Sequence, residues 1–207
     1  MCERPLDLAF LLDSSSDVGP EVFEQIVRLT FAQLLAFRFA DDVVRFAVVI
    51  YGDHPEVILR LNDYRVPVEF HRDLGGVRYI GGHANLSAAV KELDEGVFSP
   101  SYGDRPTVAD VVVHVTTIAG KDGEQSRRHR RIFEVFGTMT DRRDVKALVV
   151  DVSGTAQSVD TPYADPYDVK SYPLLDSSNL RWFSAADVDV ETGVLTALVD
   201  NVCFLGG

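Results

Sequence analysis

The amino-acid sequence predicts an α/β protein with a doubly wound, mostly parallel sheet, one antiparallel edge strand and helices on both faces. Short, nearly all-apolar runs alternate along the chain with longer segments whose apolar residues recur every three or four positions. An apolar run of this kind is typical of a strand that is buried on both faces, as strands of parallel sheets are. Only one pair of strand-like runs is joined by a segment short enough for a hairpin.

In the first half of the chain, apolar runs identify the strands, and apolar residues at helical spacing identify the helices. The elements expected there are strand Leu6–Asp13, a helix opened by Gly19-Pro20, strands Val43–Tyr51 and Glu56–Leu61, and helix Ala84–Phe98. The segment Gly52–Pro55 reads as a hairpin loop, so the two strands that it joins form the antiparallel pair.

The second half continues the same alternation. Its expected elements are strand Asp110–Thr116, helix Glu124–Met139, strands Lys146–Val152 and Leu180–Ser184, and a closing helix Val194–Phe204. Ser153–Ser178 breaks the rhythm: it is rich in Ser, Thr, Pro, Tyr and Asp, and we expect an exposed loop. We find no internal repeat and no linker, so residues 1–207 are predicted to form one domain.

Composition narrows the class of partner. With 46% hydrophobic and 25% charged residues, the chain has the makeup of a globular domain rather than a disordered one. No apolar stretch is long enough for membrane insertion. A net charge of −12 repels nucleic acid and anionic membranes, so neither is an expected partner. Basic proteins, cationic polymers and metal ions remain open.

The two cysteines, Cys2 and Cys203, stand near opposite ends of the chain. In an oxidising compartment they could form a disulfide that closes almost the whole sequence, which would stabilise the fold by about 4–5 kcal/mol in the loop-entropy model. Two unrelated thiols are the alternative. Met1–Pro5 leads directly into a strand pattern, and we recognise no signal peptide there. A secreted location would therefore have to be argued from other features of the sequence.

Oxygen-bearing side chains fill the turn after the first strand, which reads Asp13-Ser14-Ser15-Ser16-Asp17. In an open α/β sheet, ligands bind outside the carboxyl ends of the strands. Asp13, Ser15 and Asp17 could together face one hard cation such as Mg²⁺ or Ca²⁺, since these ions prefer oxygen ligands. A serine-rich turn that only caps the next helix is the alternative.

Three segments, in order, resemble the von Willebrand factor type A domain family. LDLAFLLDSSSDVG, which begins at Leu6, is similar to the family's opening strand and its Asp-x-Ser-x-Ser metal turn. Tyr79–Leu86 (YIGGHANL) resembles the Gly-Gly-x-Thr-Asn-Thr turn, and Thr116–Asp122 (TTIAGKD) stands where the family has Thr-Asp-Gly-x-Ser-x-Asp. The resemblance implies a Rossmann-like fold. It also fits the cysteines, because several matrix and plasma members are closed by cysteines that flank the first strand and last helix.

The sequence departs from the family pattern at the metal ligands. The resemblance implies direct ligands from two serines and a threonine, with two aspartates acting largely through water. Asp13 and Ser15 match, but Asp17 replaces the second serine, Ala84 the threonine and Thr117 the later aspartate. Because Ala84 offers no oxygen, we expect a degenerate site with no metal or weakly bound Mg²⁺ or Ca²⁺.

By resemblance to family members with degraded metal sites, such as those of von Willebrand factor and collagen VI, the chain is expected to be a secreted, extracellular interaction module. Its expected partners are matrix or plasma proteins, such as a collagen-like ligand, and it could have sister domains in a larger parent chain. The alternative is a metal-dependent adhesion domain, in which an acidic residue of the ligand completes a cation held by Asp13, Ser15 and Asp17.

Two surfaces are candidates for partner binding. The first is the basic run from Arg127 to Arg131, on which we single out Arg127, Arg128 and Arg131; the nearby glutamates favour the other interpretation, a solvated helix face that they partly neutralise. The second is the Ser153–Ser178 loop, whose aromatic anchors would be Tyr163, Tyr167 and Tyr172.

Three further residues are given structural interpretations. Asn85-Leu86-Ser87 is a glycosylation sequon, although the family's asparagine at this position is structural. His83 is expected in a solvent-facing loop, and His114 is expected as a hydrogen-bonded core residue.

The sequence does not predict an enzyme. A nucleotide-binding α/β domain would have Gly-x-Gly-x-x-Gly after its first strand, where this chain has consecutive serines. A phosphatase with a nucleophilic aspartate needs a second carboxylate where Ser15 stands, and we recognise no Ser/His/Asp or Cys/His set.

Overall fold

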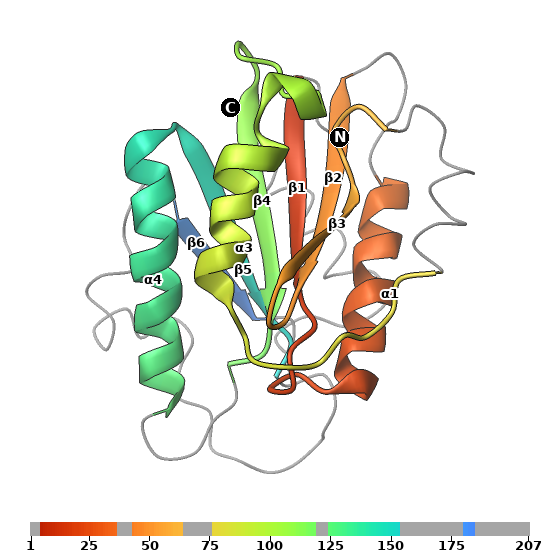
Figure 1. Ribbon diagram of the computed structural model, residues 1–207, viewed down its shortest axis with the longest axis vertical. Coiled ribbons are helices and arrows are strands. Elements are labelled where there is room, and N and C mark those ends of the chain that lie inside the picture. Colours follow the sequence, from red (N-terminus) through yellow and green to blue (C-terminus); the bar gives the residue numbers. More distant parts are fainter. Residues whose placement is uncertain (1–4, 37–42, 64–75, 119–123, 154–179, 185–207) are drawn as a thin grey trace.

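The computed structural model describes residues 5–36, 43–63, 76–118, 124–153 and 180–184. They form a sheet of the strand order β3-β2-β1-β4-β5-β6, covered by helices (Figure 1). The strands are β1 (Leu6–Asp13), β2 (Val44–Tyr51), β3 (Pro55–Leu59), β4 (Ala109–Thr116), β5 (Val145–Asp151) and β6 (Leu180–Ser184). The α-helices are α1 (Pro20–Ala36), α3 (Leu86–Glu92) and α4 (Glu124–Arg142).

The sheet is parallel except at one edge, as predicted. β1 pairs in parallel with both β2 and β4, and the parallel pairing continues through β5 to β6. β3 runs antiparallel to β2, because the hairpin predicted at Gly52–Pro55 turns the chain back. The doubly wound fold class is therefore confirmed, and strand boundaries differ from the predicted ones by no more than two residues.

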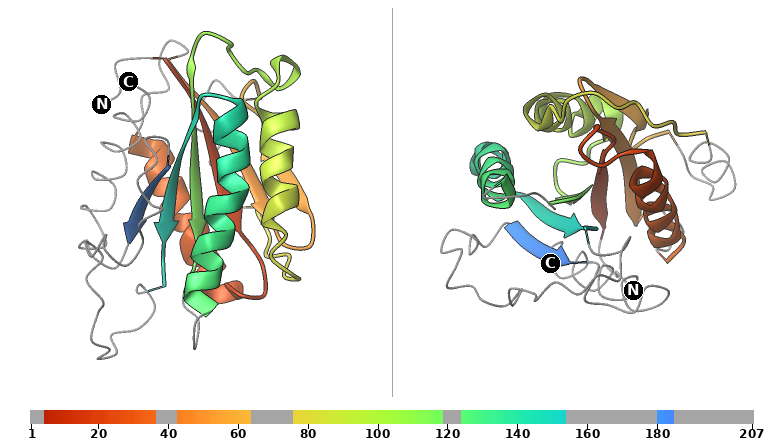
Figure 2. Two further views of the ribbon diagram at one scale, coloured as in Figure 1. Left: turned by 90° about the vertical axis from the view of Figure 1, so that its left-hand side faces the viewer. Right: turned by 90° about the horizontal axis from the view of Figure 1, so that it is seen from below.

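Side-chain alternation along the buried strands supplies two separate cores. On β1, Leu8 and Phe10 face the α1 side, where they join Phe23 and Ile26 of that helix. Ala9, with Leu11, faces the other side, which α3 and α4 cover. Figure 2 shows these two helices together on one face of the sheet and α1 on the opposite face. This double burial explains why β1 is apolar almost throughout.

The helix predicted over Ala84–Phe98 is divided in the structure. The α3 helix starts at Leu86, and a π-helical turn over Leu93–Val97 follows it, in which the Phe98 N–H donates to the Leu93 carbonyl at 2.9 Å. A short 3₁₀ turn follows at Pro100–Tyr102. The closing helix predicted at Val194–Phe204 lies outside the described residues, as does the segment after Ser153 that was predicted to be a loop.

The parallel strands all point the same way, so the loops after β1, β4 and β5 meet at one end of the sheet, the lower end in Figure 1. The loops that enter these strands meet at the opposite end. Within the described part of the chain, no helix has the length and apolar character that a membrane crossing requires.

Candidate functional site

The metal turn, which we define as Asp13–Asp17, leaves the carboxyl end of β1. Asp13 is only 3% exposed, and hydrogen bonds engage both of its carboxylate oxygens. Oδ1 accepts from the Ser15 backbone N–H at 3.0 Å, and Oδ2 accepts from the Thr116 hydroxyl at 2.6 Å. Because Thr116 ends β4, the second bond ties the two central strands together at the edge where ligands bind in such sheets.

The three serines of the metal turn have different roles. The Ser14 hydroxyl accepts the Ile80 N–H at 3.0 Å, and the Ser16 hydroxyl accepts the Gly82 N–H at 3.1 Å. Both therefore fasten the turn to the loop that precedes α3. The Ser15 hydroxyl oxygen is buried and has no hydrogen-bond partner among the residues that the structure describes. Ser15 is thus the one serine of the turn whose hydroxyl oxygen has no bond to another described residue.

Glycines allow the loop before α3 to approach the metal turn closely. Gly81 and Gly82 have φ values of 69° and 80°, in the left-handed region that favours glycine. At Gly52, a Cβ would collide with the Gly81 carbonyl oxygen, so any larger residue would push the loop away. The Gly81 N–H in turn donates to the Ser14 carbonyl at 2.9 Å.

The sequon asparagine holds the same region together. The Asn85 side-chain oxygen accepts the Ala88 N–H at 3.2 Å and so caps α3, while its amide nitrogen donates to the Asp53 carbonyl at 3.2 Å. Attachment of a glycan to that nitrogen would compete with the second bond. His83 is exposed, as predicted, and its backbone N–H donates to the Asp53 carboxylate at 2.8 Å.

The two substituted positions in the other loops provide little for a cation. Ala84 has no side-chain oxygen. The Thr117 hydroxyl lies 3.1 Å from the Ser153 hydroxyl, so the structure joins it to the loop after β5. That loop is anchored by Asp151, whose carboxylate accepts the backbone N–H groups of Ile118 and Ser153 at 3.1 and 2.9 Å.

Asp17 forms an ion pair within the chain. Its carboxylate lies 3.2 Å from the Arg128 guanidinium, with side chains 45% and 21% exposed respectively. A second guanidinium nitrogen of Arg128 lies 3.5 Å from the Thr117 carbonyl oxygen. The arginine therefore reaches from α4 across the ends of β1 and β4 and contacts both loops.

These contacts decide how well the residues fit a divalent cation. A hard cation takes six or more oxygen ligands, several of them charged. Among the described residues, Ser15 offers one neutral oxygen that has no partner, whereas each carboxylate oxygen of Asp13 already accepts one hydrogen bond and Asp17 already faces a guanidinium. Ala84 supplies nothing. The donor set at this end of the sheet, among the described residues, does not fit a resident divalent ion.

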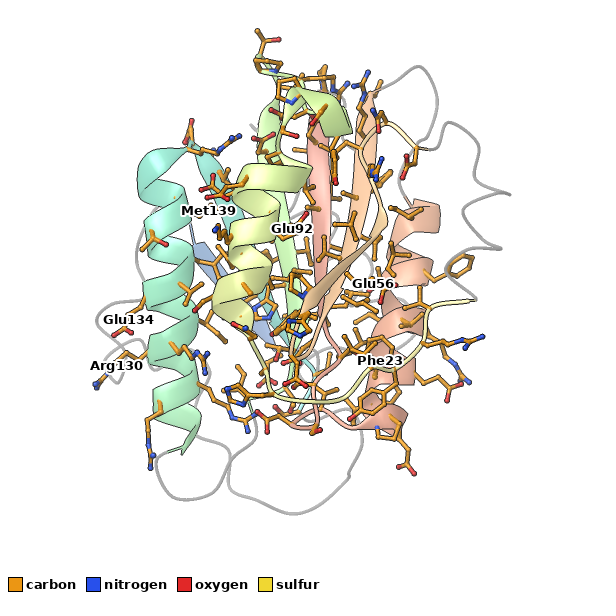
Figure 3. The ribbon with its side chains drawn as sticks, viewed as in Figure 1. Phe23, Glu56, Glu92, Arg130, Glu134 and Met139 are labelled. Atoms are coloured by element: carbon orange, nitrogen blue, oxygen red, sulfur yellow. The ribbon has the colours of Figure 1, made fainter. Side chains whose placement is uncertain are left out.

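The predicted partner-binding residues fall into two groups. Arg127 and Arg131 are exposed on α4, whereas Arg128 turns inward to the metal turn. Figure 3 shows Arg130 and Glu134 on the outer side of the same helix, so part of the basic run is the solvated face that the sequence also allowed. Tyr163, Tyr167 and Tyr172 lie outside the described residues, as do Cys2 and Cys203.

A buried polar pair lies beneath the site. The Tyr51 hydroxyl lies 2.8 Å from Nε2 of His114, and both residues are buried, which confirms the prediction of a hydrogen-bonded core histidine. Burial lowers the pKa of His114 to about 3, so the ring is neutral at physiological pH. Burial raises the pKa of Tyr51 well above its usual value, and the Asp13 carboxylate adds to the rise.

An acidic group that was not among the predicted site residues lies at the opposite end of the sheet. Asp7, Asp104 and Asp110, the amino-end cluster, bring carboxylate oxygens within 4.8 Å of one another. Asp7 and Asp110 are register partners on β1 and β4. Arg105 donates to Asp7 from its Nε at 2.8 Å, from an Nη at 2.6 Å and from its backbone N–H at 2.8 Å. An aspartate at the start of each of two apolar runs was the signal available in the sequence.

The fold and the site together define the class of protein: an open α/β domain in which a serine-rich turn, the metal turn, follows the central strand β1 at its carboxyl end. Residues 7–163 match the sequence model of the von Willebrand factor type A domain. The chain belongs to that family. The resemblance found in the motifs is thereby confirmed.

Its relatives include matrix proteins. The chain is 31% identical over 119 residues to von Willebrand factor A domain-containing protein 2 of Xenopus laevis, which covers 58% of this chain and 15% of that protein. It is 25% identical over 177 residues to the mouse collagen alpha-1(XX) chain, covering 85% of this chain and 13% of the collagen. The chain thus spans a small part of the length of these relatives.

A solved structure supports the fold. Proximal thread matrix protein 1 from the mussel byssus, in a structure described as having a zinc-occupied metal-ion-dependent adhesion site, superposes with a TM-score of 0.64. The match covers 98% of this chain and 46% of that chain at 19% sequence identity. At that identity the likeness shows the fold alone.

Proposed function

We propose that this domain is a non-enzymatic interaction module that binds extracellular matrix or plasma proteins largely without a metal ion. Family membership and collagen relatives support the extracellular setting and the matrix partner. The observation that carries metal independence is the ion pair of Asp17 with Arg128, together with the hydrogen-bonded state of Asp13. The acidic groups of the metal turn are already neutralised or bonded within the chain.

Partner binding then uses other surfaces. Arg127 and Arg131 are exposed on α4, a helix that starts at Glu124 toward the carboxyl end of the sheet, the lower end in Figure 1. On a chain of net charge −12 they can attract an acidic segment of a partner and raise its association rate. The tyrosines of the Ser153–Ser178 loop remain proposed anchors for affinity.

Surface plasmon resonance over immobilised, purified matrix proteins, with collagens among them, tests this function. We expect binding that persists in EDTA and that is unchanged in Asp13→Ala. The double variant Arg127→Glu/Arg131→Glu should slow association and weaken the salt dependence, while Tyr167→Ala should speed dissociation. Binding that requires Mg²⁺ and disappears in Asp13→Ala would contradict metal independence.

One observation favours a second candidate, the metal-dependent adhesion domain. The buried Ser15 hydroxyl oxygen has no partner among the described residues, and the backbone N–H of the same residue bonds the buried Asp13 carboxylate. Such an oxygen is costly to leave unbonded, and a cation would satisfy it. Isothermal titration with Mg²⁺ and Mn²⁺ separates the candidates, because this second function requires tight binding that Asp13→Ala removes.

A further inference from the structure

One arginine of the basic run does not belong to the solvated face of α4. Arg128 has a side chain that is 21% exposed, whereas Arg127, Arg130 and Arg131 are exposed residues. Its guanidinium contacts the Asp17 carboxylate at 3.2 Å and the Thr117 carbonyl at 3.5 Å. These two oxygens belong to the loops after β1 and β4, so a single cationic group joins the ends of two adjacent strands.

The chemistry of guanidinium makes this contact incompatible with a metal at the same place. Arginine is charged at every physiological pH, and it carries five N–H donors and no acceptor. It therefore satisfies carboxylate and carbonyl oxygens, the same groups that a hard cation uses. A metal ion bound by Asp17 would have to displace the guanidinium and would meet its repulsion at short range.

From this arrangement we infer that Arg128 is the resident cation of the site: its guanidinium joins the metal turn to the loop after β4, as a metal ion would, and excludes divalent ions. The inference rests on the proposed metal-independent function and supplies its physical cause. It has a specific consequence, because removal of the guanidinium charge should convert an inert turn into a metal site. The Asp17 carboxylate and the carbonyl oxygen of Thr117, which now face the guanidinium, would then be open to a cation.

The experiment uses this chain and Mn²⁺ alone as the probe. Arg128→Gln keeps a polar side chain but removes the charge. Arg130→Gln is the matched control, since Arg130 lies on the outer side of the same helix (Figure 3). Mn²⁺ affinity is measured by titration calorimetry and by the loss of the free-ion electron paramagnetic resonance signal, and thermal unfolding is followed with and without the ion. Circular dichroism confirms that each variant is folded.

We expect at least a tenfold gain in Mn²⁺ affinity in Arg128→Gln and none in Arg130→Gln. Arg128→Gln should melt about 2–4 °C below the wild type without metal, and Mn²⁺ should restore much of that loss. Addition of Asp17→Asn to Arg128→Gln should cancel the gain. A rescue by Mn²⁺ would distinguish a resident cation from an ordinary surface ion pair.

Two outcomes overturn the inference and differ in what they mean for the proposed function. If the wild type binds Mn²⁺ weakly and folded Arg128→Gln binds it no better, Arg128 excludes nothing, while metal-independent function stands. If the wild type itself binds Mn²⁺ tightly, the inference and the metal-independent function fail together.

Discussion

The two ends of the sheet both gather aspartates around an arginine, but they do so in different ways. At the carboxyl end, hydrogen bonds from a backbone N–H and a hydroxyl engage Asp13, and Asp17 has a partly exposed guanidinium beside it. At the amino end, Arg105 binds the fully buried Asp7 with its side chain and backbone, while Asp104 and Asp110 crowd around it.

The two ends differ in the burial of their ion pairs: the pair at the amino end is buried, and the pair at the carboxyl end is partly exposed. The side chain of Arg105 is 17% exposed and that of Asp7 is 0% exposed, so this ion pair is largely buried. Burial, and then the charges of Asp104 and Asp7, raise the pKa of Asp110 to about 8. The amino end thus contains a buried ion pair and, in Asp110, a carboxyl group that keeps its proton at neutral pH. The carboxyl end keeps Asp17 and Arg128 within reach of solvent.

The largest expected effect is at the amino end. Arg105→Ala leaves the buried Asp7 carboxylate without its guanidinium, and loss of one partner of a buried pair costs about 3–5 kcal/mol of unfolding free energy. Urea unfolding at neutral pH measures the change. The control is Arg28→Ala, which breaks the exposed pair with Glu24 and should cost less than about 0.5 kcal/mol. Equal losses of unfolding free energy in the two variants would show that burial does not make the Arg105–Asp7 pair more stabilising than the exposed pair.

Asp110 should give the domain a pH dependence of a definite sign. Below a pH of about 4, the carboxyl group is protonated in both states and contributes nothing. Between there and about 8, the unfolded chain ionises while the folded one keeps its proton, so the free energy of unfolding falls by up to about 1.4 kcal/mol per pH unit. The carboxylates of Asp104 and Asp7 and the cation Arg143 face this group.

Asp110→Asn removes this titration, so the variant should gain on the wild type as pH rises through that window and hold a constant lead above it. Urea unfolding at about pH 5, 7 and 9 measures the difference. A difference that does not change with pH would show that Asp110 ionises at its ordinary pKa in the fold.

A smaller effect is expected beneath the metal turn. Tyr51→Phe removes the hydroxyl 2.8 Å from the buried His114 ring, and the ring loses its partner at Nε2. A buried polar group without a partner costs about 1–3 kcal/mol. Tyr79→Phe is the control, because its hydroxyl donates to the Ser15 carbonyl at a longer 3.3 Å in a partly buried place. If both variants unfold at the same urea concentration, the buried pair contributes no more to stability than the longer, partly buried bond of Tyr79.

The smallest effect concerns metal at the carboxyl end. A cation near its dissociation constant adds only about 0.4 kcal/mol of stability, so millimolar Mg²⁺ should raise the melting temperature by about 1–2 °C at most. Differential scanning fluorimetry measures the shift. A shift of many degrees that vanishes in Asp13→Ala would show that the metal turn binds Mg²⁺ tightly, contrary to what its contacts indicate.

The sequence was sufficient for the fold because the signals are local. The apolar run of β1, the short segment between β2 and β3 and the helical spacing in α4 each fix an element and its neighbours. The carboxyl-end residues were also predictable, since strand ends of a parallel sheet meet at one edge. The side-chain partners could not be predicted. The sequence indicated a turn for Asp17 and a helix for Arg128, but it contains no information on the distance between them.

The amino-end cluster was missed for a related reason. Asp7 and Asp110 meet only because β1 and β4 pair in one particular register, and register between parallel strands is set by the packing of the whole sheet. Each aspartate alone reads as the polar start of a strand. Arg105 lies in the connection before β4, where composition does not indicate a buried ion pair.

The position of β1 has a consequence for hydrogen exchange. Every residue of this strand is buried, and it is hydrogen-bonded to a parallel neighbour on each side along nearly its whole length. Local fraying cannot open such a strand, so its amide protons should exchange only when the whole domain unfolds. The metal turn is therefore attached to the part of the molecule that opens least often. Asp13 and Ser15 should therefore hold their places on the timescale of local opening, and the contacts that the turn makes with neighbouring loops start from a fixed base.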